Sequence, residues 1–330
     1  MLKLRWIAGL LCLAALAPVF AQDKDKAKDK AAKDKGEGVK LAWKFEKGKP
    51  FYQEMTTETK QTMKVMGSDV VQNQKQTFYF SWTPEKQEAD GSWVIQQEIL
   101  GVKMDIDIGG SKISYDSTKT DNPANPLGEF FKALIGSKFT LTVDKNNKVT
   151  KVEGRKEFLD KLAAANPQMK PLLDQILSEE ALKEMADPTF AVVPTKEVKK
   201  GDTWEKTSKL DMGPIGKYEN SYKYTFEGPD AKTKLDKIKV DTTLKYVPPS
   251  DSATGGSLPF KIKSADLKST DASGTVTFDN AKGRVASSEQ KLNLKGDLSI
   301  EIGGQTTKVE LNQTQTTTVK TTDTNPVPKK

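Results

Sequence analysis

Most of the chain alternates apolar and polar residues with a period of two, which is typical of β-strands with one apolar face. Two long Thr-rich segments, 51–66 and 70–82, are separated by Gly67-Ser68-Asp69. A glycine-containing turn between two alternating segments predicts a β-hairpin. Leu41, Trp43 and Phe45 alternate in the same way and predict a short strand before it.

The alternation recurs along both halves of the chain. In the first half it predicts strands over 93–100, 104–108, 139–143 and 149–152. In the second half it predicts strands over 204–210, 218–226, 238–246, 260–267, 275–278, 284–288, 292–302 and 306–319. A one-sided apolar sheet must bury that side against another layer, so these strands predict curved or packed sheets.

Helical spacing of apolar residues occurs in two places. A short helix is predicted near 127–135, and a longer helical segment over 155–187 that ends at Asp187-Pro188. Within the longer segment, Asn166-Pro167 restarts the helix and Ser178 can cap its last part. The segment is interpreted either as a packing element over an open sheet face or as a mobile lid over a cavity.

The two halves resemble each other. Lys47-Gly48 precedes Phe51 in the same way that Lys200-Gly201 precedes Trp204. Three further matches follow in the same order: 76–82 with 222–228, 93–100 with 237–246, and 140–152 with 275–287. The sequence therefore predicts an internal repeat in a mainly β (α+β) protein, with two related antiparallel β-meander units. These units are expected to form curved sheets, half-barrels or a sandwich, with the helical segment between them.

The N-terminus has the pattern of a secretory signal peptide. Lys3 and Arg5 precede an apolar run from Trp6 to Leu16, and small residues precede a cleavage site near Ala21. Export to the periplasm or the medium is expected. The apolar run is shorter than the roughly 20 residues of a spanning helix, and no other segment approaches that length, so an integral membrane protein is not expected.

These patterns divide the chain into consecutive parts. The predicted parts are a signal peptide (1–21), a disordered charged linker (22–38), a first β unit (39–154), a helical segment (155–187), a second β unit (188–320) and a disordered tail (321–330). The linker is assigned from its alternating Lys and Asp residues and its lack of apolar residues to bury.

Composition excludes several kinds of chemistry. The sequence has no histidine, and its only cysteine, Cys12, lies inside the predicted signal peptide. Ser-His-Asp catalysis, Cys-His catalysis and ordinary zinc sites are therefore excluded from the mature chain. Asp105 and Asp107 lie on one face of a predicted strand and are interpreted as solvent-facing residues rather than cation ligands. No enzyme activity, catalytic residue, cofactor or metal is predicted.

The formal net charge of +7 does not predict nucleic-acid binding. The excess is lysine spread evenly among acidic residues, and Arg155 and Arg284 are the only arginines after the predicted cleavage site. A nucleic-acid interface needs a concentrated basic face. We interpret the charge as a solubility coat that also protects sheet edges.

Aromatic side chains gather on a few predicted strands and are the candidate ligand-facing residues. They are Phe78, Phe80, Trp82, Trp93, Tyr222, Tyr224 and Phe226. The alternative is that they form core or cross-strand aromatic ladders.

Several stretches resemble a known family. FYQEMTTETKQTMKVMG, KQTFYFSW, GVKMDIDIGGSKISYDSTK, FTLTVDKNNKVTKVEGRKEF and KKGDTW…LDMGPIG are similar to an uncharacterised bacterial family of secreted proteins, a domain of unknown function. The resemblance covers about Leu41 to Ser288 and implies a secreted, β-rich protein without known site residues. The pattern of strands and helices also resembles the curved sheets of periplasmic lipoprotein carriers, which is an analogy of fold alone.

Three functions remain open at the level of sequence. The first is a non-enzymatic exported protein that binds an apolar ligand, such as a lipid or another apolar small molecule, or a cell-envelope partner. The second is a structural or assembly component of the envelope. The third is a carboxylate-based hydrolase, which would need two facing acids drawn from residues such as Glu54, Glu58, Glu98 or Asp107.

Overall fold

The computed structural model of the chain describes residues 38–122, 126–249, 258 and 260–327. The predicted signal peptide and linker residues 22–37 lie outside this part, so both stay predictions. Among the described residues, no helix has both the length and the apolar character that crossing a bilayer requires.

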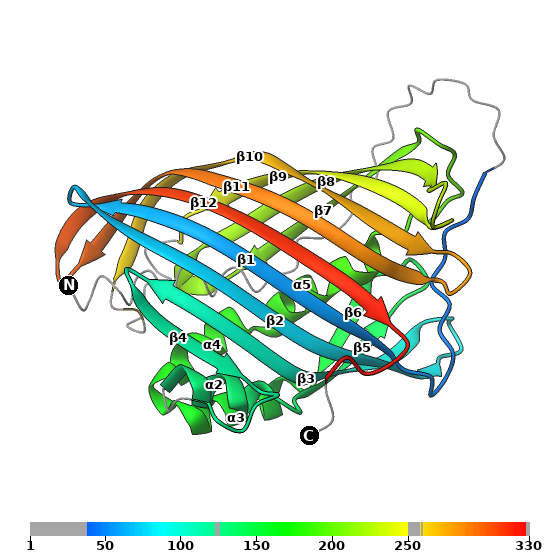
Figure 1. Cartoon of the computed structure of the whole chain (residues 1–330), viewed down its shortest axis with the longest axis horizontal. Coiled ribbons are helices and arrows are strands. Elements are labelled where there is room, and N and C mark those ends of the chain that lie inside the picture. The colour runs from blue at the N-terminus through cyan, green and yellow to red at the C-terminus, as the bar shows by residue number, and fades with distance from the viewer. Residues whose placement is uncertain (1–37, 123–125, 250–257, 259, 328–330) are drawn as a thin grey trace.

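Twelve antiparallel strands form one open, curved sheet, which confirms the predicted mainly β class (Figure 1). The strands are β1 (Phe51–Val65), β2 (Ser68–Gln87), β3 (Trp93–Ile108), β4 (Ser111–Asp116), β5 (Lys138–Val143), β6 (Val149–Glu153), β7 (Thr203–Asp211), β8 (Lys217–Pro229), β9 (Asp236–Val247), β10 (Lys261–Asp279), β11 (Arg284–Ile302) and β12 (Gln305–Thr322). Their order across the sheet is β6-β5-β3-β2-β1-β12-β11-β10-β9-β8-β7, and β4 pairs with β3 beside this path.

The hairpin β1–β2 shows why the alternating pattern folds as it does. Its loop is Met66-Gly67, with φ of 50° and 80°, and two positive φ values are what a two-residue type I′ turn requires. Val65 pairs with Ser68 and Phe51 with Trp82, so the register stays constant along the strand. The odd-numbered residues of β1 therefore share one face, which is the concave face of the sheet.

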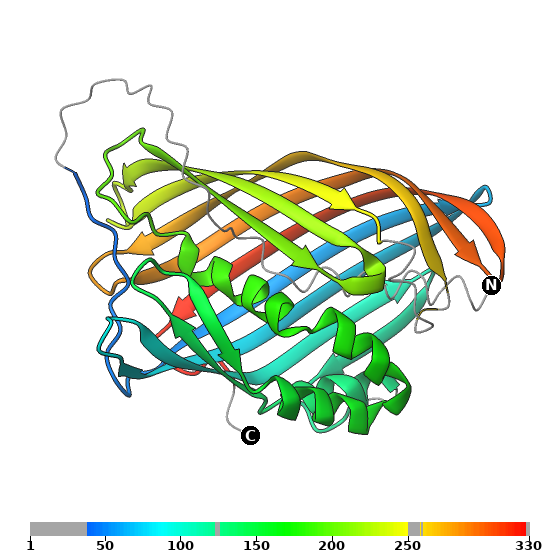
Figure 2. The same ribbon diagram turned by 180° about the vertical axis from the view of Figure 1, so that it is seen from behind.

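The first and last strands lie side by side in the middle of the sheet. β1 pairs with β12 from Tyr52–Thr322 to Val65–Val309. The two predicted units are therefore parts of one continuous sheet rather than two halves of a sandwich. β6 and β7 end the sheet on its two sides, and the sheet curls around the helices that lie on its concave side (Figure 2).

The turns that begin the two units have matching geometry. The Gly48 N–H donates to the Pro84 carbonyl at 2.7 Å, and the Gly201 N–H donates to the Phe226 carbonyl at 2.7 Å. Both glycines have positive φ, 74° and 91°. Phe51 stacks on Trp82 across the β1–β2 pair, and Trp204 stacks on Tyr224 across the β7–β8 pair.

Irregularities of the sheet also recur between the two units. Glu85 has no partner in the β2–β3 register, and Glu227 has none in the β8–β9 register. Each follows the residue whose carbonyl accepts from the turn glycine, Pro84 in the first unit and Phe226 in the second. The β5–β6 and β10–β11 hairpins are each shifted at the same place, after Thr142 and after Thr277. These shared bulges support the internal repeat at the level of backbone geometry.

The register corrects one detail of the sequence match. Trp82 pairs with Phe51, and Tyr224 pairs with Trp204, so Trp82 and Tyr224 are equivalent. The match of 76–82 with 222–228 instead placed Trp82 opposite Gly228, four residues further along. Aromatic residues repeat every two positions on both strands, so the sequence alone allows several alignments of similar quality.

Four short helices are described: α2 (Pro126–Leu134), α3 (Arg155–Ala165), α4 (Lys170–Ile176) and α5 (Glu179–Ala191). The Ser178 hydroxyl accepts from the Ala181 N–H and caps α5 as expected. The predicted helix end at Asp187-Pro188 is wrong, because α5 continues to Ala191 with Pro188 inside it. Phe190 is fully buried against Trp43 and Trp82, and this packing offsets the hydrogen bond that Pro188 cannot make.

Two segments next to the sheet also differ from expectation. Residues 41–45 form no strand, and the Trp43 indole N–H instead donates to the Phe190 carbonyl, in the last turn of α5, at 3.0 Å. The prediction of a disordered tail from residue 321 places the end of the folded region too early. β12 runs to Thr322, and Asp323 forms ion pairs with Lys282 and Arg284.

Candidate functional site

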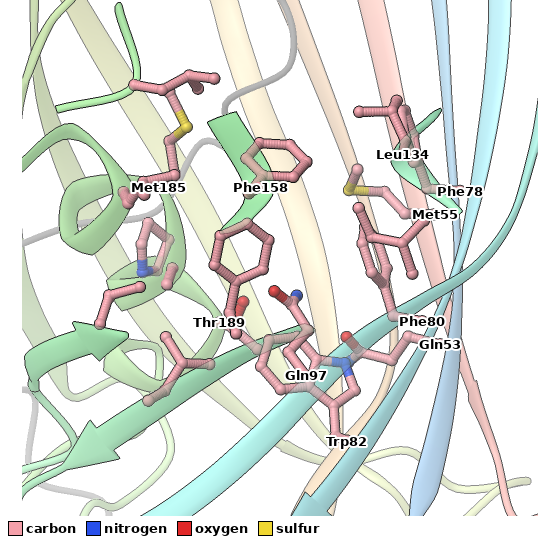
Figure 3. A pocket seen from close by; sticks show the side chains of 18 of the residues that line it. Gln53, Met55, Phe78, Phe80, Trp82, Gln97, Leu134, Phe158, Met185 and Thr189 are labelled. Atoms are coloured by element: carbon pink, nitrogen blue, oxygen red, sulfur yellow. The ribbon is translucent and has the colours of Figure 1, made fainter. Parts of the chain in front are cut away.

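A cavity of about 230 Å³ lies between the concave face of the sheet and the helices. Strands β1, β2, β3, β5 and β6 supply one wall, residues of β10, β11 and β12 extend it, and all four helices supply the other wall. The sheet curves because its strands are long and twisted, and this curvature leaves space for side chains between the two layers. Figure 3 shows the side chains that converge there.

The sheet wall is built by alternate residues of β1 and β2. Met55 and Phe78 face each other in the register, as do Gln53 and Phe80. Phe78 stacks on Phe80 at 5.9 Å between ring centroids, and Phe80 lies 6.4 Å from Trp82. Because every second residue of a strand points to the same side, three aromatic rings of one strand form a continuous surface.

The helix wall is built by apolar residues at helical spacing. They include Phe131 and Leu134 of α2, Phe158 and Leu162 of α3, Leu173 and Ile176 of α4, and Leu182 and Met185 of α5, and the polar Thr189 follows Met185 by four residues. Each pair or triplet is separated by three or four residues, so it projects from one side of its helix. These apolar sides face Phe78, Phe80 and Met55 across the cavity (Figure 3).

The polar lining of the cavity is uncharged. Gln53, Gln97, Thr189 and Ser288 are its polar residues, and Figure 3 places the first three at one end, near Trp82. The Gln53 amide donates to the Thr321 hydroxyl at 3.3 Å. No Lys, Arg, Asp or Glu lines the cavity within the described residues.

Carboxylates proposed for a hydrolase lie elsewhere. Glu58 forms an ion pair with Lys75 at 2.7 Å, and Glu98 pairs with Lys138 at 3.5 Å. Asp107 accepts a hydrogen bond from the Gly110 N–H in the β3–β4 turn. In the described part of the chain, these acids are engaged on the sheet and do not face each other across the cavity.

The seven aromatic candidates lie in three different surroundings. Phe78, Phe80 and Trp82 line the cavity. Trp93 packs edge-on against Phe45 at 5.6 Å and is not part of the lining.

Tyr222, Tyr224 and Phe226 are the remaining three candidates. They lie in a separate buried cluster with Ile238, Val240 and Phe278, under the β8–β9 side of the sheet. That all seven face a ligand stays a prediction. The contacts of the last three are those of a core.

Sequence reasoning missed the contribution of the helices to the site. The sequence favours either a packing element or a lid for the helical segment, and none of its side chains is among the candidate ligand-facing residues. The signal was present in the apolar spacing of residues such as Phe158, Leu162, Leu173 and Met185, but spacing alone cannot tell a packed core from a cavity wall.

Helix α5 is attached to both edges of the open sheet. The Asp187 carboxylate accepts from the Val149 N–H of β6 at 2.6 Å, and the Glu184 carboxylate accepts from the Lys209 N–H of β7 at 3.1 Å. Each acid thus satisfies an edge-strand donor that has no neighbouring strand. One helix joins the two ends of the sheet and covers the cavity between them.

Burial changes the acidity of both carboxyls. Desolvation raises the pKa of Asp187 to about 7, against the lowering effect of the Val149 hydrogen bond. Its second oxygen has no hydrogen-bond partner among the described residues. Desolvation also raises the pKa of Glu184. From both shifts we expect the attachment of α5 to depend on pH.

Comparisons with solved structures give weak likenesses. A lipovitellin structure entitled "Lipid-protein interactions in lipovitellin" matches with a TM-score of 0.44 and 8% identity, covering 87% of this chain and 27% of that chain. DynF from the dynemicin pathway of Micromonospora chersina matches with a TM-score of 0.20 and 8% identity, covering 91% and 92%. OccK7 (OpdD) of Pseudomonas aeruginosa matches with a TM-score of 0.22 and 7% identity, covering 83% and 99%.

This chain spans about a quarter of the length of the lipovitellin chain that it matches. A comparison with curated proteins yields no match. The model of a family of unknown function, DUF6263, matches residues 90–285, which run from the turn before β3 to the start of β11. The matched region is more than half of the sequence and includes all four described helices and the edge strands that α5 joins. The protein belongs to the DUF6263 family, whose function is unknown.

Proposed function

We propose that this protein is an exported, non-enzymatic binding protein that holds an apolar ligand, such as the acyl chain of a lipid, between its curved sheet and its helices. One observation carries the proposal: a cavity of about 230 Å³ whose described lining is mostly aromatic and aliphatic and contains no charged side chain. Ligand sites are commonly apolar cavities of this kind with a few uncharged polar groups.

The size of the cavity limits the ligand. Its volume of about 230 Å³ is below the roughly 300–1,000 Å³ of pockets that hold drug-sized molecules. We expect one slender chain rather than a bulky ring system. Because no cation lines the described cavity, burying an anionic group there would cost several kcal/mol, on the order expected for an unpaired charge.

Non-enzymatic binding is favoured by the chemistry of the wall. Gln53, Gln97, Thr189 and Ser288 can orient a ligand by hydrogen bonds but are poor general acids or bases. Export rests on the N-terminal pattern of Lys3, Arg5 and the apolar run that follows.

The proposal is tested by titrating the chain from residue 22 onward with methyl cis-parinarate, a neutral ester whose fluorescence rises in apolar surroundings. The wild type should give saturable binding. Ala186→Phe adds a ring on the cavity side of α5 and should weaken binding at least about ten-fold.

Glu180→Phe is the matched control, since it adds the same ring to the exposed side of the same helix. Circular dichroism melts establish that both variants are folded. A wild type without saturable binding would refute the proposal. So would a folded Ala186→Phe variant that binds as tightly as Glu180→Phe.

A further inference from the structure

The concave face of the sheet changes character immediately beyond the cavity. On β1 the residues after Met55 are Thr57, Thr59 and Gln61, and on β2 the facing residues are Gln76, Gln74 and Gln72. All six are less than a tenth exposed, and we call them the Gln/Thr belt. Gln290 of β11 and Gln315 of β12 are buried as well and continue the belt across the sheet.

The belt adjoins the cavity. Phe78 and Met55 line the cavity. Gln76 lies two residues before Phe78 and Thr57 two residues after Met55, so both are on the same face about 7 Å along their strands. On β11, Ser288 lines the cavity and Gln290 is the next residue on that face. A ligand with its tail among the aromatic rings can therefore reach the belt with its head.

The belt contains hydrogen-bonding groups that the protein does not satisfy. Gln72 donates to Gln74 at 3.3 Å, and Gln74 donates to Gln76 at 3.2 Å, so a ladder of amides runs toward the cavity. At its end, the Gln76 side-chain nitrogen has no partner among the described residues. The same holds, within that part of the chain, for both amide atoms of Gln61, the Thr59 hydroxyl and the Gln290 nitrogen.

Such groups are unusual in a folded protein. A buried polar atom without a partner costs stability, so native structures satisfy nearly all of them with protein, water or ligand. Four residues with unsatisfied atoms on three strands form a cluster rather than an isolated defect. The cluster is explained if a bound molecule supplies the missing partners.

The geometry points to a lipid with an uncharged, hydroxylated head, such as a monoacylglycerol, as the ligand, with its head on the Gln/Thr belt. The open groups are both donors and acceptors, and a hydroxyl can serve both at once. No charged side chain is among the belt residues, so a phosphate or carboxylate would lack a counter-ion. This inference rests on the proposed function, because it assigns the head of the ligand whose tail fills the cavity.

The test compares three ligands with the same chain as competitors of methyl cis-parinarate: 1-monoolein, methyl oleate and oleate. The wild type should bind monoolein about ten-fold more tightly than methyl oleate, and more tightly than oleate. Gln61→Leu and Gln76→Leu should each reduce the preference for monoolein to less than about three-fold, because they weaken the binding of monoolein more than that of methyl oleate.

Lys60→Leu is the control, because it places the same side chain on the exposed face of β1, beside Gln61. The empty Gln61→Leu variant should melt no lower than the wild type, since the substitution removes an unpartnered buried amide. The ratio of monoolein affinity to methyl oleate affinity in the wild type tests the inference even if a variant does not fold.

Two results would overturn the inference while the proposed function stands. One is equal binding of monoolein and methyl oleate by the wild type, which would mean that only water satisfies the belt. The other is a preference for oleate, which would mean that the head is anionic. Failure of all three ligands to displace the probe would refute both the inference and the proposed function.

Discussion

Single residues determine how firmly helix α5 is attached to the sheet, and Asp187 is the clearest case. Its carboxyl is buried between α5 and β6, where one oxygen accepts from Val149 and burial raises its pKa to about 7. Lys148 and Lys206 lower this pKa and Glu184 raises it, but desolvation is the largest effect.

The raised pKa predicts a pH-dependent stability. The folded protein keeps a proton on Asp187 up to about pH 7, whereas the unfolded chain loses this proton above pH 3.8. The contribution of Asp187 to the free energy of unfolding is therefore fully present below about pH 4 and is lost as the pH rises through 7. Asp187→Asn stays neutral and its amide oxygen can still accept from Val149. Above pH 7 we expect it to be more stable than the wild type by up to about 4 kcal/mol, at 1.36 kcal/mol per pKa unit.

Urea denaturation at pH 4 and pH 8 checks this prediction. The difference between the two proteins should vanish at pH 4. An equal difference at both pH values would mean that the effect comes from packing and not from the charge.

Glycine positions differ in what they demand of the backbone. Gly296 of β11 has φ of 148°, and a Cβ there would lie 1.9 Å from the Asp266 carbonyl of β10. Gly303 lies in the β11–β12 turn with φ of 58° and open space around it. Gly296→Ala should therefore cost about 3 kcal/mol or more, from a backbone clash, whereas Gly303→Ala should cost about 1–2 kcal/mol from the positive φ alone. Chemical denaturation of both variants compares the costs, and similar values would contradict the assigned close approach.

At the scale of elements, α5 acts as a bridge between the two free edges of the sheet. Glu184 and Asp187 accept from opposite edge strands, β7 and β6. Glu184→Ala should increase hydrogen exchange of the Lys209 amide about ten-fold or more and leave Val149 unchanged, since a hydrogen bond to a charged group contributes about 1.5–3 kcal/mol.

Asp187→Ala should produce the opposite pattern, with faster exchange at Val149 and no change at Lys209. The two variants are therefore controls for each other. Equal acceleration of both amides in each variant would indicate general destabilisation and would remove the bridge from the account.

The sequence predicts the elements better than their arrangement. Alternation and glycine turns are local signals, so strands such as β1 and β2 and their hairpin follow from them. The pairing of β1 with β12 joins residues from 244 (Val65–Val309) to 270 (Tyr52–Thr322) positions apart, and no local pattern encodes it. The end of α5 was misplaced because packing of Phe190 outweighs the local preference of Pro188.

The candidate site was recoverable in part. Phe78, Phe80 and Trp82 were identifiable because three aromatics share one strand face. Tyr222 and Tyr224 show the same pattern and lie in a buried cluster. The pattern therefore indicates that a side chain is buried, but it does not distinguish a packed core from the wall of a cavity. The Gln/Thr belt could not be recognised, because strands with polar residues on both faces give no contrast in an alternating pattern.

At the scale of the whole molecule, one curved sheet and one helical layer enclose an apolar space. The pairing of β1 with β12 joins the strands of the two predicted units into one surface that is wide enough to curl. Helix α5 then closes the open side by contacts with β6 and β7. This construction provides a covered cavity without the disulfides that a chain with one cysteine cannot form.

Native mass spectrometry of the protein purified without detergent from cells that export it tests the central claim most directly. We predict a species heavier than the polypeptide by the mass of one lipid, which organic extraction removes and which Glu180→Phe retains. The same species should be depleted in Ala186→Phe. A spectrum with only the bare polypeptide, both as purified and after incubation with monoolein or methyl oleate, would contradict the claim that the cavity binds an apolar ligand.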